Sequence, residues 1–138
     1  MSAVSILRSV ATPKKALAGA ALAAATCGTL IAATPAQAAP TAAASAQATA
    51  QQMIGDSAQY QCFSNIVQRE SGWNPTATNP SSGAYGLVQA LPATKMASAG
   101  SDWKTNPTTQ IQWGLGYMNE RYGSPCDAWD FWQSNNWY

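Results

Sequence analysis

The feature that most constrains this fold is an amphipathic helix that carries an acid on its apolar face. Apolar side chains recur every three or four residues over 57–71, the spacing of one helix face. They are Tyr60, Phe63, Ile66 and Val67. Glu70 continues the same face. Asp56 suits the N-cap, and Gly72 can adopt the left-handed conformation that ends a helix, so we predict that the helix stops at Ser71.

The position of Glu70 makes it a candidate for catalysis. A carboxyl group on the core side of a helix loses solvation, which disfavours the charged form and favours a raised pKa. A carboxylic acid that stays protonated towards neutral pH is what general-acid chemistry needs. The alternative is that Glu70 is a structural acid that pairs with Arg69 or a backbone donor, or that it reaches water at the edge of the core.

The N-terminus has the three parts of an export signal. A basic, acid-free start over 1–15 precedes an Ala-rich apolar run over 16–33 and an A-x-A cleavage signature at 36–38. We therefore predict a signal peptide over 1–38 and a secreted or cell-wall protein. A membrane anchor is the alternative, although an Ala-rich run with two glycines spans a bilayer poorly. We expect no stable membrane insertion after cleavage.

Composition divides the remaining chain in two. Residues 39–53 are mostly Ala, Thr, Ser and Gln, with few large apolar groups, so we predict a flexible linker. An Ala-rich helix is the alternative, but the sequence indicates no partner for it. Residues 54–138 then form the folded domain. After cleavage the chain keeps four basic and six acidic residues. This balance does not favour a nucleic-acid partner.

The cysteine count favours a disulfide. Cys27 leaves with the signal peptide, and the pair Cys62 and Cys126 remains. An even pair in an exported chain indicates a disulfide, and this one would close a loop of roughly 65 residues, worth ~4 kcal/mol in the chain-entropy model. Two free, buried thiols are the alternative.

The absence of histidine narrows the chemistry. The sequence contains none, which excludes Ser-His-Asp and Cys-His catalysis. With the two cysteines paired, no zinc site remains, and we expect neither a metal nor an organic cofactor. Carboxylate chemistry is the main catalytic option left. Six tryptophans and five tyrosines all lie between Tyr60 and Tyr138. Aromatic faces suit carbohydrate, although most of these rings are expected to fill the core of a small domain.

Further elements follow from Gly, Pro and cap signals. Residues 72–84 are rich in turn formers, 85–89 suggest a short extended or hairpin segment, and 92–97 a short helix with Pro at its first position. Asn106-Pro107 and Ser124-Pro125 each start a helix. In the first of these helices the buried face is Ile111, Leu115, Met118 and Tyr122. Gly114 and Gly116 would weaken it, which suggests close packing at those positions.

The segment 70–94 resembles a known family. Its fixed positions are Glu70-Ser71, Trp73, Pro75, Ala77, Gly83-Ala84-Tyr85-Gly86-Leu87-Val88-Gln89, Pro92 and Thr94. This order resembles the signature of soluble lytic transglycosylases of the lysozyme superfamily, and 54–138 is similar to compact secreted domains of this kind from actinobacteria. Val88 stands where the family usually has Met. The resemblance implies an α+β, mainly α, lysozyme-like fold of the goose type, with a small β element near Tyr85–Gln89.

The resemblance also implies a site and a reaction. Glu70 would be the catalytic acid, protonating the β-1,4 glycosidic oxygen between N-acetylmuramic acid and N-acetylglucosamine, and would then act as base on the muramoyl C6 hydroxyl to give a 1,6-anhydro product. Substrate would be contacted by Ser71, Tyr85, Gly86, Leu87, Gln89 and Tyr117. The partner would be the glycan strands of peptidoglycan, and we expect a monomer.

Two other functions fit the same residues. A muramidase on the same fold would hydrolyse the same bond with water, and would need a second acid or a positioned water. No second acid lies in the motif region, since the next one along the chain is Asp102. A non-catalytic wall-binding or aggregation-promoting protein would keep the fold without the reaction, and an intact Glu70 argues against it.

Overall fold

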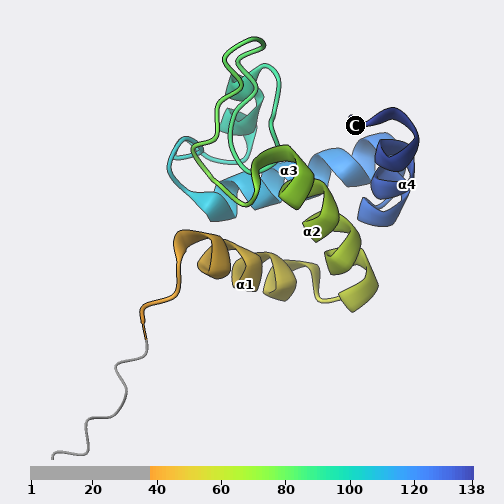
Figure 1. The fold of residues 1–138 in the computed structure, drawn as a ribbon, viewed down its shortest axis with the longest axis horizontal. Helices are drawn as coiled ribbons and strands as arrows, with labels where there is room; N and C mark the ends of the chain where they lie inside the picture. Colours follow the sequence, from red (N-terminus) through yellow and green to blue (C-terminus); the bar gives the residue numbers. More distant parts are fainter. Residues whose placement is uncertain (1–37) are drawn as a thin grey trace, which may run out of the picture. The chain divides into compact units, whose positions relative to one another are not determined.

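The computed structural model describes residues 38–138, which are mainly helical (Figure 1). The predicted signal peptide covers residues 1–38, so all of it except Ala38 lies outside the described residues, as does Cys27. The elements are α1 (Ala42–Ile54), α2 (Ser57–Ser71), the 3-10 helix η1 (Ala93–Ser98), α3 (Pro107–Tyr122) and α4 (Pro125–Asn135). Between Ala38 and Tyr138, no helix is long and apolar enough to cross a bilayer.

Helix α1 corrects one prediction. We expected a flexible linker over 39–53, but 42–53 are helical. Thr41 caps the helix by accepting a hydrogen bond from the Ala44 N–H (3.1 Å), and Gly55 ends it with φ 71°. Ala46 and Ala50, one turn apart, are 2% and 0% exposed where α1 packs on α2 and α3. The prediction took the absence of large apolar groups as a sign of a linker. A helix face of small side chains can nevertheless pack, because it lets two helices approach closely.

Helix α2 has the predicted bounds and caps. The Asp56 carboxylate accepts a hydrogen bond from the Gln59 N–H (2.8 Å), and Gly72 ends the helix with φ 58°. The predicted apolar face is confirmed, since Phe63, Ile66 and Val67 are fully buried. The last turn of α2 therefore leaves the core at Glu70.

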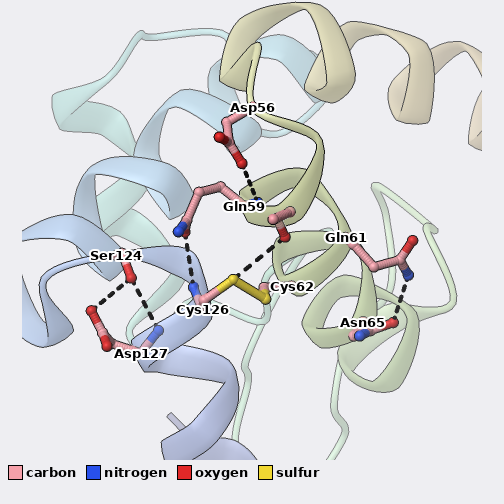
Figure 2. Close-up of a disulfide and its surroundings, with 9 residues drawn as sticks. Asp56, Gln59, Gln61, Cys62, Asn65, Ser124, Cys126 and Asp127 are labelled. Atoms are coloured by element: carbon pink, nitrogen blue, oxygen red, sulfur yellow. Dashed lines mark hydrogen bonds between the residues drawn. A yellow bond between two sulfur atoms is a disulfide. The ribbon is translucent and has the colours of Figure 1, made fainter.

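The predicted disulfide is present and joins α2 to α4 (Figure 2). Cys62 and Cys126 are bonded, with their Cα atoms 4.9 Å apart. Beside the bond, the Cys126 N–H donates to the Gln59 side-chain oxygen (3.1 Å). Ser124 caps α4 by accepting from the Asp127 N–H (3.1 Å). The end of the chain, more than sixty residues after Cys62, is thereby fixed against the helix that carries Glu70.

The segment between α2 and α3 corrects a second prediction. The expected small β element near 85–89 is not formed, and residues 38–138 contain no β-strand. Tyr85 and Ala90 instead exchange two backbone hydrogen bonds, of 3.2 and 3.1 Å, and 86–89 form a turn between them. Gly86 (φ 81°) and Gln89 (φ 51°) have positive φ angles, which interrupt an extended strand. This segment rises above the helices at the top of Figure 1.

Helix α3 packs against the turn formed by residues 86–89. Its predicted face is present, with Ile111 and Met118 fully buried and Leu115 and Tyr122 partly so. A Cβ atom added at Gly114 would lie 2.5 Å from a Val88 methyl group, which confirms close packing there. At Gly116 a Cβ would meet nothing within 4 Å, so close packing does not explain that glycine.

Candidate active site

Glu70 opens into a pocket of about 290 Å³. The other lining residues come from the 79–91 segment, η1, α3 and the end of the chain. They are Asn79, Ala84, Val88, Gln89, Ala90, Leu91, Lys95, Trp113, Tyr117, Trp137 and Tyr138. Glu70 is the one acid in this lining and Lys95 the one formally charged base. The pocket can therefore supply a single carboxyl group to a bound molecule.

Two opposing effects act on the Glu70 carboxyl group. Partial burial at the end of α2 removes water and raises the pKa of Glu70. The Trp132 indole N–H, from α4, donates a hydrogen bond of 2.7 Å to Oε1 and lowers the pKa. Burial is the larger effect, so the pKa of Glu70 lies above 4.5. Such a group can carry its proton further towards neutral pH than an exposed glutamate.

The Trp132 ring itself contacts a side chain from each of two helices. The Arg69 guanidinium lies 5.6 Å from the centre of its ring. The Trp129 ring stacks on it at 5.4 Å, with 18° between the planes. The donor that meets Glu70 is thus fixed in place by α2 and α4 together.

Two of the predicted substrate residues line the pocket. The Gln89 side-chain amide donates to the carbonyls of Ala77 and Gly86, each at 3.0 Å, which holds it across the turn. Tyr117 stacks on Trp113 with 5.2 Å between ring centres and 16° between planes. Burial is the main cause that raises the pKa of Tyr117. The structure therefore brings Glu70, Gln89 and Tyr117 to one cavity.

The other four predicted substrate residues lie outside this lining. The Ser71 hydroxyl is 2.7 Å from the Leu87 carbonyl, its nearest acceptor. The Tyr85 hydroxyl donates to the Lys104 carbonyl (2.7 Å). Leu87 is fully buried, and Gly86 lies against a side chain of α3. Their contacts shape the turn that carries Val88 and Gln89.

Gln110 organises this turn and was not predicted. It is fully buried on α3, and its Oε1 accepts from the Leu87 N–H (2.8 Å). Its Nε2 donates to the carbonyls of Pro75 (2.9 Å) and Trp103 (2.8 Å). A Cβ on Gly86 would lie 2.5 Å from Gln110 Oε1, so the bare glycine backbone makes room for this side chain. No sequence pattern distinguished Gln110 from the exposed Gln112.

The end of the chain forms another wall that the sequence did not assign. The Tyr138 hydroxyl donates to the Val88 carbonyl (2.7 Å), and its ring meets the Tyr117 ring edge-on at 5.7 Å. Burial, and next the nearby Glu70 carboxylate, hold the pKa of Tyr138 well above 10.0. Trp137 is half exposed at the mouth. The clustering of aromatic residues near the C-terminus was the available signal.

The donor set does not suggest a metal centre. Across residues 38–138 no three His, Cys, Asp or Glu side chains come together in a way that would hold a metal ion.

Comparison with known proteins gives one match. The family model described as the transglycosylase SLT domain matches residues 46–136. That range begins within α1, eight residues before the predicted domain start, and contains Glu70 and Trp132. It stops just before Trp137 and Tyr138. Searches of curated proteins and of solved structures gave no significant match.

Proposed function

Since this chain belongs to the transglycosylase SLT domain family, we propose that it is a secreted lytic transglycosylase of peptidoglycan. It cleaves the β-1,4 bond between N-acetylmuramic acid and N-acetylglucosamine and leaves a 1,6-anhydro end on the muramoyl product. The observation that carries this proposal is the environment of Glu70. This carboxyl group has a raised pKa and is the single acid in the lining of the pocket.

The reaction needs one group that first gives and then takes a proton. In the first step, protonated Glu70 donates its proton to the glycosidic oxygen as the C1–O bond breaks, and the N-acetylglucosamine part leaves as an alcohol. In the second step, the Glu70 carboxylate removes the proton from the muramoyl C6 hydroxyl, whose oxygen bonds to C1. Glu70 ends as it began, and no water is consumed.

The pocket favours this reaction over hydrolysis. Hydrolysing glycosidases use two carboxyl groups, roughly 5–9.5 Å apart, one on each side of the bond. In the lining described above, Glu70 has no acidic partner. Asp102, the next acid along the chain, is engaged elsewhere, where its carboxylate accepts from Thr109 and Asn106 at 2.7 Å each.

The remaining lining suits a glycan. The stacked rings of Trp113 and Tyr117 give a flat apolar face with a hydroxyl at its edge, which matches the mixed character of a sugar ring. Lys95 supplies a positive charge for the carboxylates that muramoyl groups or their peptides carry. Cleavage at the A-x-A signature at 36–38 would release the chain to the cell wall.

Mass spectrometry of digested peptidoglycan tests the proposal. Purified sacculi are incubated with the chain from Ala39 onwards, or with its Glu70→Gln variant, and the released muropeptides are weighed with and without borohydride reduction. We expect 1,6-anhydro products, which borohydride leaves unchanged, from the natural chain. Glu70→Gln keeps an acceptor for Trp132 but no acidic proton, and should lower the rate by about 100-fold or more.

The other outcomes identify the rival functions. Products that borohydride reduces would make the protein a muramidase and would require a second carboxylate or a positioned water. Binding to sacculi without release of any muropeptide, equal in both chains, would make it a wall-binding protein.

A further inference from the structure

The contact between Trp132 and Glu70 makes the two oxygens of the carboxyl group inequivalent. An indole nitrogen has one hydrogen and no acceptor lone pair, so it can only donate. The oxygen that it meets at 2.7 Å, Oε1, must therefore be an acceptor in both protonation states. The carbonyl oxygen of a carboxylic acid is a better acceptor than its hydroxyl oxygen, so this contact favours the protonated form of Glu70 with the hydrogen on Oε2. A carboxyl group without such a partner would carry its proton on either oxygen.

We propose that Trp132 is the positioning residue for Glu70: its N–H holds Oε1 so that the transferable proton lies on Oε2, and Arg69 holds the indole ring in place. This inference rests on the proposed function for its catalytic consequence, but its geometry does not depend on it. In the first step Oε2 delivers the proton. In the second step the Trp132 hydrogen bond becomes charge-assisted and stabilises the carboxylate that has formed.

The surroundings of this pair leave Glu70 as the group that titrates in acid. Charged and titratable side chains approach from every neighbouring element, namely Arg69 on α2, Lys95 on η1, Tyr117 on α3 and Tyr138 after α4. The raised pKa values of both tyrosines keep their hydroxyls neutral in acid and at neutral pH. Among these side chains, Glu70 is therefore the group whose ionisation in acid can change its hydrogen bond with Trp132.

A titration of the natural chain tests the geometry without any activity. The Glu70 side-chain carboxyl carbon and the Trp132 indole N–H are followed by NMR from about pH 3 to pH 8, the range around an ordinary glutamate pKa. We expect both signals to move with one common midpoint, and the indole signal to lose its pH dependence in Glu70→Gln. An indole signal that does not shift while Glu70 titrates would overturn the proposal.

Kinetics on peptidoglycan test the consequence. Trp132→Phe keeps a ring under Arg69 but removes the N–H, so kcat should fall roughly tenfold with KM nearly unchanged. Loss of a bond that favours the charged form raises the pKa of Glu70, so the alkaline limb of the kcat/KM profile should move to higher pH. Gln133→Ala is the control, because Gln133 is an exposed neighbour of Trp132 on α4 for which the structure shows no hydrogen bond with Glu70, and neither kcat nor the limb should change.

The outcomes separate this proposal from the proposed function. An alkaline limb that stays in place in folded Trp132→Phe would overturn the positioning role. If Trp132→Phe does not fold, the coupled NMR titration of the natural chain decides. A natural chain that is inert on every peptidoglycan would overturn the transglycosylase, while a common midpoint for Glu70 and Trp132 would still establish the positioning of the carboxyl group.

Discussion

Gln110 offers the sharpest test of how the pocket is built. Gln110→Met keeps the length of the side chain and removes all of its hydrogen bonds. The Leu87 N–H and the carbonyls of Pro75 and Trp103 then lose the partner that the structure gives them. Each buried polar group without a partner costs about 1–3 kcal/mol, so the variant should lose at least about 3 kcal/mol of unfolding free energy.

That loss is large for a domain of this size. Small domains have unfolding free energies of roughly 5–15 kcal/mol, and about 3 kcal/mol corresponds to a fall in Tm on the order of 12 °C or more. Urea unfolding followed by tryptophan fluorescence measures it, since Trp73 and Trp103 are buried in the same core. Gln112→Met is the matched control, because Gln112 is an exposed glutamine on the same helix. Its effect should stay within about 0.5 kcal/mol.

Two results would refute the argument about Gln110. The first is a loss in Gln110→Met below about 1 kcal/mol, which would mean that the three backbone groups find other partners or water at little cost. The second is an equal loss in the two methionine variants, which would place the effect in helix propensity rather than in the buried hydrogen bonds.

Further predictions concern the disulfide, the α3 glycines, Lys95 and the charge on Glu70. Replacing Cys62 and Cys126 together by Ser opens a loop of 64 residues and should cost ~4 kcal/mol in urea unfolding; an oxidised natural chain no more stable than the variant would contradict this. Gly114→Ala should lower the unfolding free energy by about 1–3 kcal/mol because the added Cβ would collide with Val88. Gly116→Ala should raise it by up to about 1 kcal/mol because the added Cβ has no atom within 4 Å and alanine favours the helix. Thermal melts of the two variants check that the effects have opposite signs. Lys95→Gln should raise KM for peptidoglycan about two- to fivefold at low salt with kcat unchanged, and the difference should vanish in high salt, because Lys95 is exposed. The folded-state pKa of Glu70 lies above its ordinary value of 4.5, so the unfolding free energy of the natural chain should fall as pH rises from about 4.5 through the folded-state pKa. Over that pH range, Glu70→Gln should become more stable relative to the natural chain. Urea unfolding measures this, and parallel pH curves for the two chains would show that Glu70 ionises without a cost in stability.

Capping residues and prolines in the sequence predicted the helices whose ends they define. Asp56 and Gly72, Asn106-Pro107 and Ser124-Pro125 each act within a few residues of chain, so their effect can be judged without knowing the fold. Helix α1 was only the alternative to a linker, because its stability comes from Ala46 and Ala50 packing on other helices, and the sequence does not show those partners. The β element was wrong because Gln89, a residue with no turn preference of its own, has a positive φ that the hydrogen bonds of its side chain support.

The residues of the candidate site were predictable where the pattern within a single helix identifies them. Glu70 follows from the periodicity of α2 alone. Trp132 and Tyr138 do not, because their contacts with Glu70 and Val88 join segments separated by 62 and 50 residues. The family motif over 70–94 added Ser71, Tyr85, Gly86 and Leu87 as substrate residues. In the structure these four residues contact backbone and core, so part of the motif specifies the shape of the turn, and their role with substrate stays a prediction.

The proposed reaction requires one carboxyl group first to donate a proton and then to accept one, and the contacts of Glu70 support both steps. A fully solvated glutamate would ionise too readily to act as the acid, while a dry one without a donor would hold its proton too strongly to act as the base. Partial burial meets the first need, and the Trp132 N–H meets the second. The donor is neutral, so it stabilises the carboxylate less than an arginine or lysine at the same distance would. The pKa of Glu70 therefore stays raised, as a single acid that must act in both directions requires.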